Sequence, residues 1–209
     1  MIYHKGQFET FLTGEAEKQG VTESKLKERG TFAAKQIMNR INQKALLLSQ
    51  GAMIAAGYAG ATWLSAAFGI AYGAVQFRLS EALTVLCAFT PAAVPGLAVG
   101  CLLGNLASPY GVWDIVLGAV STLLAALAGR KLRRVTVKGI PVLTLLMPVL
   151  FNALFVGAET AVLSGGEAGL PAFFVAAAQV AAGEAAVCFL GGIPLFFAVK
   201  KSRVFRNES

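Results

Sequence analysis

The chain has 209 residues, of which 56% are hydrophobic and 14% charged, and its formal net charge at pH 7 is +7. Its mean hydropathy is +0.65. Because about a quarter of the residues in an ordinary soluble domain are charged, this composition excludes that class and predicts an integral membrane protein built of α-helices.

The basic residues are concentrated in three segments, which indicates how the chain is oriented. Seventeen of the 18 Lys and Arg residues lie in residues 1–44, 130–138 and 200–209. The positive-inside rule places these segments, and therefore both termini, in the cytoplasm. It places outside the cell the connections that contain no Lys or Arg, at residues 68–77, 106–112 and 163–171. The net charge then needs no nucleic-acid partner, although it also favours contact with anionic membrane lipid.

Residues 1–44 are mostly polar and precede the first apolar run, so no cleavable signal sequence is expected. The stretch TESKLKERGTFAAKQIMNRINQK places Leu26, Ile37 and Ile41 among Lys and Arg. This pattern predicts a cytosolic or interfacial amphipathic helix, and a solvated, partly disordered segment is an equally good interpretation.

The first membrane-spanning helix is expected at about residues 46–68. Within it, Ala52, Ala56 and Gly60 are spaced four apart and form a smooth surface that another helix can approach closely. Ordinary packing inside the protein is the alternative explanation, because Ala and Gly are abundant throughout the chain.

Residues 79–108 are expected to cross the membrane twice, because they connect two external segments. Pro91 and Pro95 lie at the centre of this stretch, and a proline inside a helix breaks its hydrogen-bond ladder. Two helices that meet at a proline-containing turn would each have about 14 residues, or about 21 Å, which is short for a hydrocarbon core about 30 Å thick. A re-entrant hairpin is the alternative.

Three further apolar runs, at residues 112–127, 140–163 and 171–199, complete the predicted fold. The fold is an all-α integral membrane protein with six transmembrane helices, of which the second and third are short. The expected organisation is a cytoplasmic polar segment at 1–44, a six-helix membrane domain at 45–201 and a cytoplasmic tail at 202–209.

Few residues offer covalent or metal chemistry. His4 is the single histidine, and Cys87, Cys101 and Cys188 lie in apolar segments without metal-ligand spacing, as buried thiols do. Many of the glycines lie inside apolar runs, and nothing resembles a phosphate-binding loop. The sequence therefore predicts neither an enzyme nor a bound cofactor or metal, and any ATP hydrolysis has to come from a partner.

Polar side chains at membrane depth are costly and are therefore candidates for ligand binding. Asn152 and Glu159 are seven residues apart in one apolar run, and Glu184 lies near the middle of the next. Carboxylates accept hydrogen bonds and amides both donate and accept, which suits a planar, donor-rich heterocycle such as a guanine-like base. The candidate set is Glu81, Glu159, Glu184, Asn152, Gln76, Arg78 and Gln179.

Structural roles are the alternative for these side chains. Glu159 and Glu184 can be protonated and bonded to the backbone, Arg78 can be a surface anchor, and Asp114 can cap a helix. Arg78 and Glu81 are three apart at the expected external start of a helix, where the helix dipole favours a carboxylate.

Several blocks of the sequence resemble one family. The blocks VQFRLSEALTVL, FTPAAVPGLAVGCLLGNL, WDIVLGAVSTLLAALAGRKL, NALFVGAE and GEAAVCFLGGIPL are similar to the QueT family, the queuosine-precursor substrate-binding (S) components of energy-coupling factor (ECF) transporters, over about residues 45–201. The resemblance implies a six-helix protein of the bacterial plasma membrane that binds queuine or another 7-deazaguanine from outside. It also implies partners, one transmembrane T subunit and two ATPases, that supply the energy. The long polar N-terminal segment and Gly57 depart from the family pattern.

S components resemble one another in an Ala-x-x-x-Ala pair on the first helix that docks on the T subunit, and by this likeness Ala52 and Ala56 form that pair. Two other functions of the whole protein are compatible with the sequence.

One is an S component for another heterocyclic vitamin, since a fold alone does not specify its ligand. The other is a membrane structural or assembly protein whose polar residues serve only helix packing.

Overall fold

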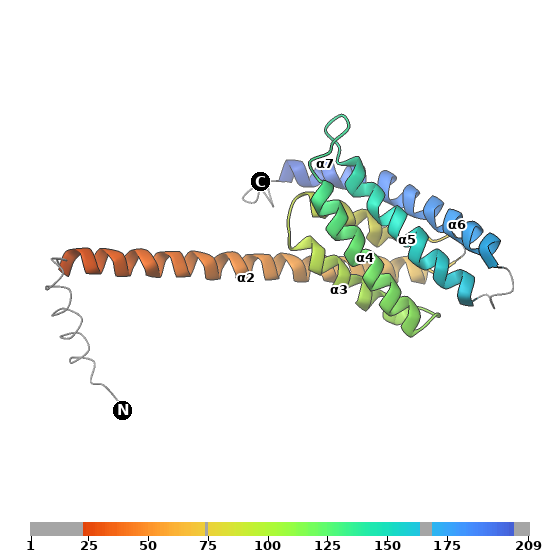
Figure 1. The fold of residues 1–209 in the computed structure, drawn as a ribbon, viewed down its shortest axis with the longest axis horizontal. Helices are drawn as coiled ribbons and strands as arrows, with labels where there is room; N and C mark the ends of the chain where they lie inside the picture. Colours follow the sequence, from red (N-terminus) through yellow and green to blue (C-terminus); the bar gives the residue numbers. More distant parts are fainter. Residues whose placement is uncertain (1–22, 74, 164–168, 203–209) are drawn as a thin grey trace, which may run out of the picture. The chain divides into compact units, whose positions relative to one another are not determined.

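The computed structural model describes residues 23–73, 75–163 and 169–202. These residues form six α-helices and two 3-10 helices, and no strand occurs among them (Figure 1). The expected all-α class is confirmed. Residues 1–22, the tail from residue 203 and most of the connection at 163–171 lie outside the described residues.

The helices follow one another along the chain with short connections. In chain order they are α2 (Glu23–Ala67), η1 (Leu79–Ala88), α3 (Ala93–Gly104), η2 (Asn105–Ala107), α4 (Val112–Leu132), α5 (Val142–Leu163), α6 (Gly169–Leu190) and α7 (Gly192–Ser202).

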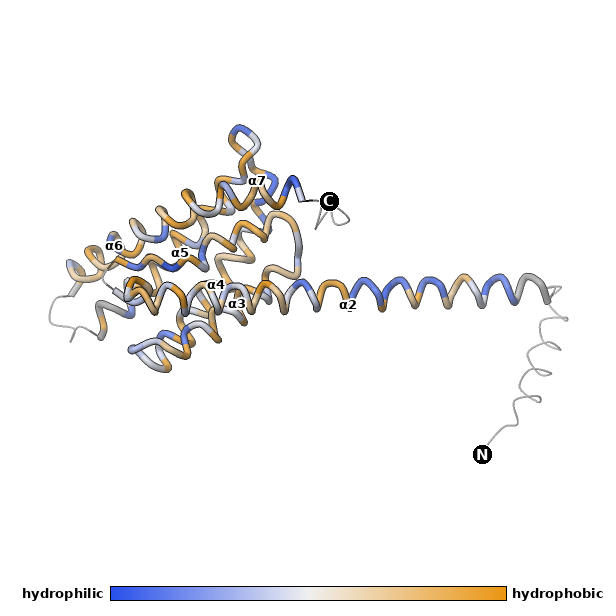
Figure 2. The backbone as a smooth tube through the Cα atoms, turned by 180° about the vertical axis from the view of Figure 1, so that it is seen from behind, coloured by the Kyte–Doolittle hydropathy of each residue, from blue (hydrophilic) through white to orange (hydrophobic). Residues whose placement is uncertain are grey.

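Within the described residues, three stretches are long and apolar enough to cross a membrane: Val112–Leu132, Val142–Glu159 and Leu170–Ser202. Leu79–Ala88 and Ala93–Ala107 are shorter apolar helices. Figure 2 shows the hydrophobic character of α3 to α7. The length and apolar composition of these helices therefore indicate a membrane protein.

The chain divides into two compact units, Met1–Leu46 and Leu47–Ser209. In the first unit, residues 23–46 are helical, and every described side chain from residue 27 to residue 46 is exposed. The apolar side chains Phe32, Ile37 and Ile41 are each more than half exposed. This part of α2 is mainly hydrophilic in Figure 2.

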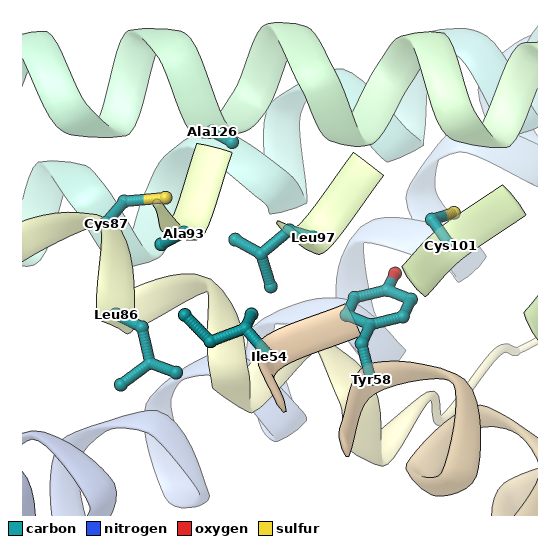
Figure 3. Close-up of a cluster of buried hydrophobic side chains, with 8 residues drawn as sticks. All are labelled: Ile54, Tyr58, Leu86, Cys87, Ala93, Leu97, Cys101 and Ala126. Carbon is teal, nitrogen blue, oxygen red and sulfur yellow. The ribbon is translucent and has the colours of Figure 1, made fainter. Parts of the chain in front are cut away.

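In the second unit, one buried cluster joins α2, η1, α3 and α4 (Figure 3). Because lipid is as apolar as the helix surfaces, such helices associate mainly through close packing and interhelical hydrogen bonds. All three cysteines are buried and free, as interpreted from the sequence. The cluster consists of Ile54, Tyr58, Leu86, Cys87, Ala93, Leu97, Cys101 and Ala126.

Glycines on α3 allow its backbone to pack directly on α2. A Cβ atom added to Gly96 would lie 2.7 Å from the carbonyl oxygen of Gly51, and one added to Gly100 would lie 2.7 Å from Cβ of Tyr58. Both separations are too short for real atoms, so glycine is required at these positions. The small residues Ala52 and Ala56 lie on an exposed face of α2 instead.

The first short helix after α2 differs from expectation in its type. We expected about 14 residues of helix, and the structure has a 3-10 helix of 10 residues, η1. In a 3-10 helix, side chains three apart lie in line. Glu81, Thr84 and Cys87 therefore share one face, and all three are buried.

The last apolar run also differs from expectation, because it forms two helices instead of one. The chain turns at Gly191 between α6 and α7. Pro194 lacks the N–H that would bond the carbonyl of Leu190, so the ladder is interrupted there. Gly192 lies so close to α5 that an added Cβ would be 2.7 Å from Cδ2 of Leu145.

The close packing of α2 on α3 predicts the effect of a single methyl group. Gly100→Ala should lower stability by about 1–3 kcal/mol through overpacking, measured as a lower melting temperature of the detergent-purified protein. Gly60→Ala is the matched control, because nothing lies within 4 Å of its added Cβ. Equal melting temperatures for the two variants would contradict the tight contact.

Candidate functional site

Glu81 is the centre of a buried polar cluster. It lies in the first turn of η1 and is 0% exposed. The phenol of Tyr58 on α2 donates a hydrogen bond to its Oε1 atom, whereas Oε2 has no hydrogen-bond partner within the described residues. Sequence reasoning missed Tyr58, although it is the only tyrosine in the first apolar run.

Asn152 of α5 and Glu184 of α6 complete this cluster. Both are buried. The Asn152 amide lies near the carboxyl groups of Glu81 and Glu184, and Oγ of Ser121 donates to its Oδ1 at 2.6 Å. Because its oxygen accepts this bond, Asn152 presents its NH2 end to the two carboxyl groups. Neither oxygen of Glu184 has a hydrogen-bond partner in the described part of the chain.

Gln76 and Gln179 have different relations to this cluster. Gln76 is buried, and its backbone packs on α6 at Gly183, where any side chain would collide with the Gln76 carbonyl. Gly183 directly precedes Glu184, so Gln76 lies beside the cluster. Gln179 is half-buried, and five residues of α-helix turn it about 140° away from Glu184. The structure does not bring Gln179 into the cluster.

Arg78 forms a buried ion pair. Its Nη2 atom lies 3.3 Å from both carboxylate oxygens of Asp114, and its Nε donates to the carbonyl of Ala71 at 3.3 Å. The side chains of Arg78 and Asp114 are 2% and 1% exposed, so Arg78 is not a surface anchor. The backbone carbonyl of Asp114 accepts a hydrogen bond from Asn105 at 2.8 Å. Arg78 and Asp114 are 36 positions apart along the chain, so sequence reasoning could not pair them.

Two tyrosine hydroxyl groups form hydrogen bonds between the connection from α2 to η1 and the segments packed against it. Tyr72 lies under the Arg78 guanidinium, with 5.3 Å from the ring centroid to Cζ. Its hydroxyl donates to the carbonyl of Gly104 at 3.0 Å, and Tyr110 donates to the Tyr72 carbonyl at 3.1 Å. Burial raises the pKa of the Tyr72 phenol above its ordinary value, so this side chain remains a donor further into the alkaline range.

Glu159 lies in a separate part of the site. It is 5% exposed, and neither of its oxygens has a hydrogen-bond partner among the described residues. The charges that influence Glu159 are those of Asp114 and Arg78, whereas those that influence Glu184 are Glu81 and Arg78. Arg78 therefore acts on both parts of the site.

The polar groups of the cluster are suited to binding a ligand. Free acceptor oxygens next to an amide suit a ligand that donates hydrogen bonds. No group of three or more His, Cys, Asp or Glu residues in the described part of the chain could hold a metal ion.

Residues 48–201 match the QueT transporter family. This is more than half of the chain. The chain belongs to the QueT transporter family. All seven candidate ligand residues lie within the matched stretch, and membership assigns the protein a role in transport of a small molecule.

The queuosine precursor transporter QueT of Lactococcus lactis subsp. cremoris (strain MG1363) is a relative, 34% identical over 73 residues. The alignment covers 35% of this chain and 43% of the relative, so the chain matches less than half of the relative's length. No solved structure matches the chain.

The buried ion pair predicts an asymmetric mutational response. Asp114→Ala should cost about 3–5 kcal/mol of stability, because it leaves the Arg78 guanidinium buried without a counter-charge. Replacing both partners by apolar side chains, as in Arg78→Met with Asp114→Leu, should cost much less. Thermal unfolding in detergent measures the stability of the single and the double variant. If the double variant is as unstable as the single one, the instability does not come from the unpaired guanidinium.

Proposed function

We propose that the protein is the S component of an ECF importer, a six-helix subunit that binds queuine or another 7-deazaguanine from outside the cell. The observation that carries the proposal is the pair of buried carboxyl groups, Glu81 and Glu184, with three acceptor oxygens that have no partner within the described residues. Family membership supports the same conclusion.

The chemistry of a guanine-like base complements these groups. Its ring N–H and exocyclic amine are neighbouring donors on one edge, which a carboxylate can accept together. The NH2 group of Asn152 is a donor for the ring carbonyl. We assign Glu81, Glu184 and Asn152 to this edge, Gln76 to the wall, and Arg78 to an electrostatic role through its pairing with Asp114. Gln179 makes no contact with this cluster that would support a role in ligand binding.

The account extends to the assembly. We propose that residues 1–44 and 202–209 are cytoplasmic and that residues 45–201 form six transmembrane helices, with η1 and α3 as the short second and third. The partners would be a transmembrane T subunit, which docks on Ala52 and Ala56, and two ATPases that supply the energy. The exposure of Ala52 and Ala56 on α2 supports a surface for docking.

Ligand-induced stabilisation tests the proposal. A ligand at 100 times its dissociation constant should add about 2.7 kcal/mol to the stability of the detergent-purified protein. The panel is queuine, aminomethyl and cyano deazaguanines, guanine and riboflavin. Stabilisation by riboflavin alone would indicate an S component for another vitamin. No stabilisation by any compound would favour a structural protein.

Conversion of the carboxylates to amides tests the site. Glu81→Gln or Glu184→Gln replaces an acceptor by an NH2 group that faces a ligand donor. An unsatisfied buried polar group costs about 1–3 kcal/mol, so the affinity for a deazaguanine should fall about 5- to 150-fold in calorimetry. Glu28→Gln, at an exposed position of α2, is the control. If both variants bind as the parent does, these carboxylates are structural.

The docking surface can be tested separately from the ligand site. Ala56→Leu should block copurification with the T subunit and ATPases while leaving ligand binding unchanged, because a bulky side chain prevents close helix approach. Ala178→Leu makes the same change at an exposed position of α6 and should leave assembly intact. Copurification of the Ala56→Leu variant at the native ratio would refute this docking face.

Labelling in intact cells tests the proposed topology. A cysteine at Pro109 should react with a membrane-impermeant maleimide from outside, and one at Arg134 should not, because basic loops stay inside. Both positions are exposed, and the native cysteines are buried. Labelling at Arg134 from outside would reject the orientation.

A further inference from the structure

Tyr58 is held in place by the close packing of α2 on α3. Its side chain is 0% exposed and belongs to the buried cluster of Figure 3, in which the hydroxyl points away from α2. Its Cβ atom lies so near α3 that a Cβ atom added to Gly100 would be 2.7 Å away. A ring packed in this way has little room to move, so its hydroxyl oxygen has a well-defined position.

This hydroxyl determines which oxygen of Glu81 is available to a ligand. The phenol of Tyr58 donates to Oε1 of Glu81, whereas Oε2 has no hydrogen-bond partner in the described part of the chain. A carboxyl group is planar, so a bond to one of its oxygens also sets the direction of the other. Glu81 therefore presents one oriented acceptor atom, Oε2.

Other contacts hold the backbone of Glu81. Its carbonyl accepts hydrogen bonds from Oγ1 of Thr84 at 2.6 Å and from Sγ of Cys188 on α6 at 3.8 Å. Glu184 precedes Cys188 by about one helical turn and so lies on the same face of α6. The backbone of Glu81 is thus fixed beside Glu184, and the remaining freedom is that of the Glu81 side chain.

We infer that Tyr58 is a positioning residue of the ligand site, which makes no contact with the ligand but aims Oε2 of Glu81 at it. This inference rests on the proposed function, in which Glu81 accepts hydrogen bonds from the edge of the base. Without the Tyr58 hydroxyl the ligand itself would have to order the Glu81 side chain, and ordering a flexible side chain on binding lowers affinity. Through this role α2 contributes to ligand binding as well as to packing.

Removal of the hydroxyl alone tests the inference. Tyr58→Phe keeps the ring, and its affinity for queuine and for the aminomethyl and cyano deazaguanines should fall about 2- to 10-fold, the cost of ordering one side chain. Calorimetry on the full-length chain in detergent measures this. Tyr72→Phe is the matched control, because it removes a hydroxyl that donates to the Gly104 carbonyl at 3.0 Å, and it should leave the affinity unchanged.

A double-variant cycle shows whether Tyr58 acts through Glu81. In a Glu81→Ala background there is no carboxyl group to orient, so adding Tyr58→Phe should cause no further loss of affinity. A purely structural role would lower the melting temperature without this dependence on Glu81. Gly100→Ala, which presses on Tyr58 but retains its hydroxyl, is a second variant and should weaken binding only while the Glu81 carboxyl group is present.

Two results would overturn the inference and leave the proposed function intact. One is a Tyr58→Phe variant that binds the deazaguanines as tightly as the parent chain does. The other is an equal loss of affinity with and without the carboxyl group of Glu81. If the parent chain binds none of the three deazaguanines, the proposed function fails, and the inference fails with it.

Discussion

The ion pair between Arg78 and Asp114 is the interaction on which the arrangement of the site depends. A guanidinium cannot be buried among apolar helices without a counter-charge, so the segment that carries Arg78 has to meet the start of α4. Because Arg78 directly precedes η1, the same contact fixes where that helix begins. Glu81, three residues later, then lies against Tyr58 of α2.

A second constraint is the burial of more acidic than basic groups. Asn152 and Tyr58 offset part of the cost for Glu81, and Arg78 is shared among the remaining carboxyl groups. A site that is incompletely satisfied in this way is expensive for stability. It is also well suited to a ligand rich in donors, because the ligand completes the hydrogen bonding that the protein leaves unmade. The cost of the unfilled site and the affinity for the ligand then have the same physical origin.

The sequence predicted those features that depend on local composition. Long apolar runs and the clustering of Lys and Arg located α4, α5 and the last apolar run, and the rarity of charge at membrane depth marked Glu81, Glu159 and Glu184 as candidates for ligand binding. It could not predict partners that are distant along the chain, such as Asp114 for Arg78. The sequence also did not predict that η1 is a 3-10 helix or that the chain turns at Gly191, since both features depend on packing against other helices.

A structure of the chain with a deazaguanine bound, determined in detergent or lipid, tests the central claim most directly. The account predicts that the donor edge of the base contacts Oε2 of Glu81 or the carboxyl group of Glu184, with Asn152 beside it. A ligand bound elsewhere, without contact to either carboxyl group, would contradict it.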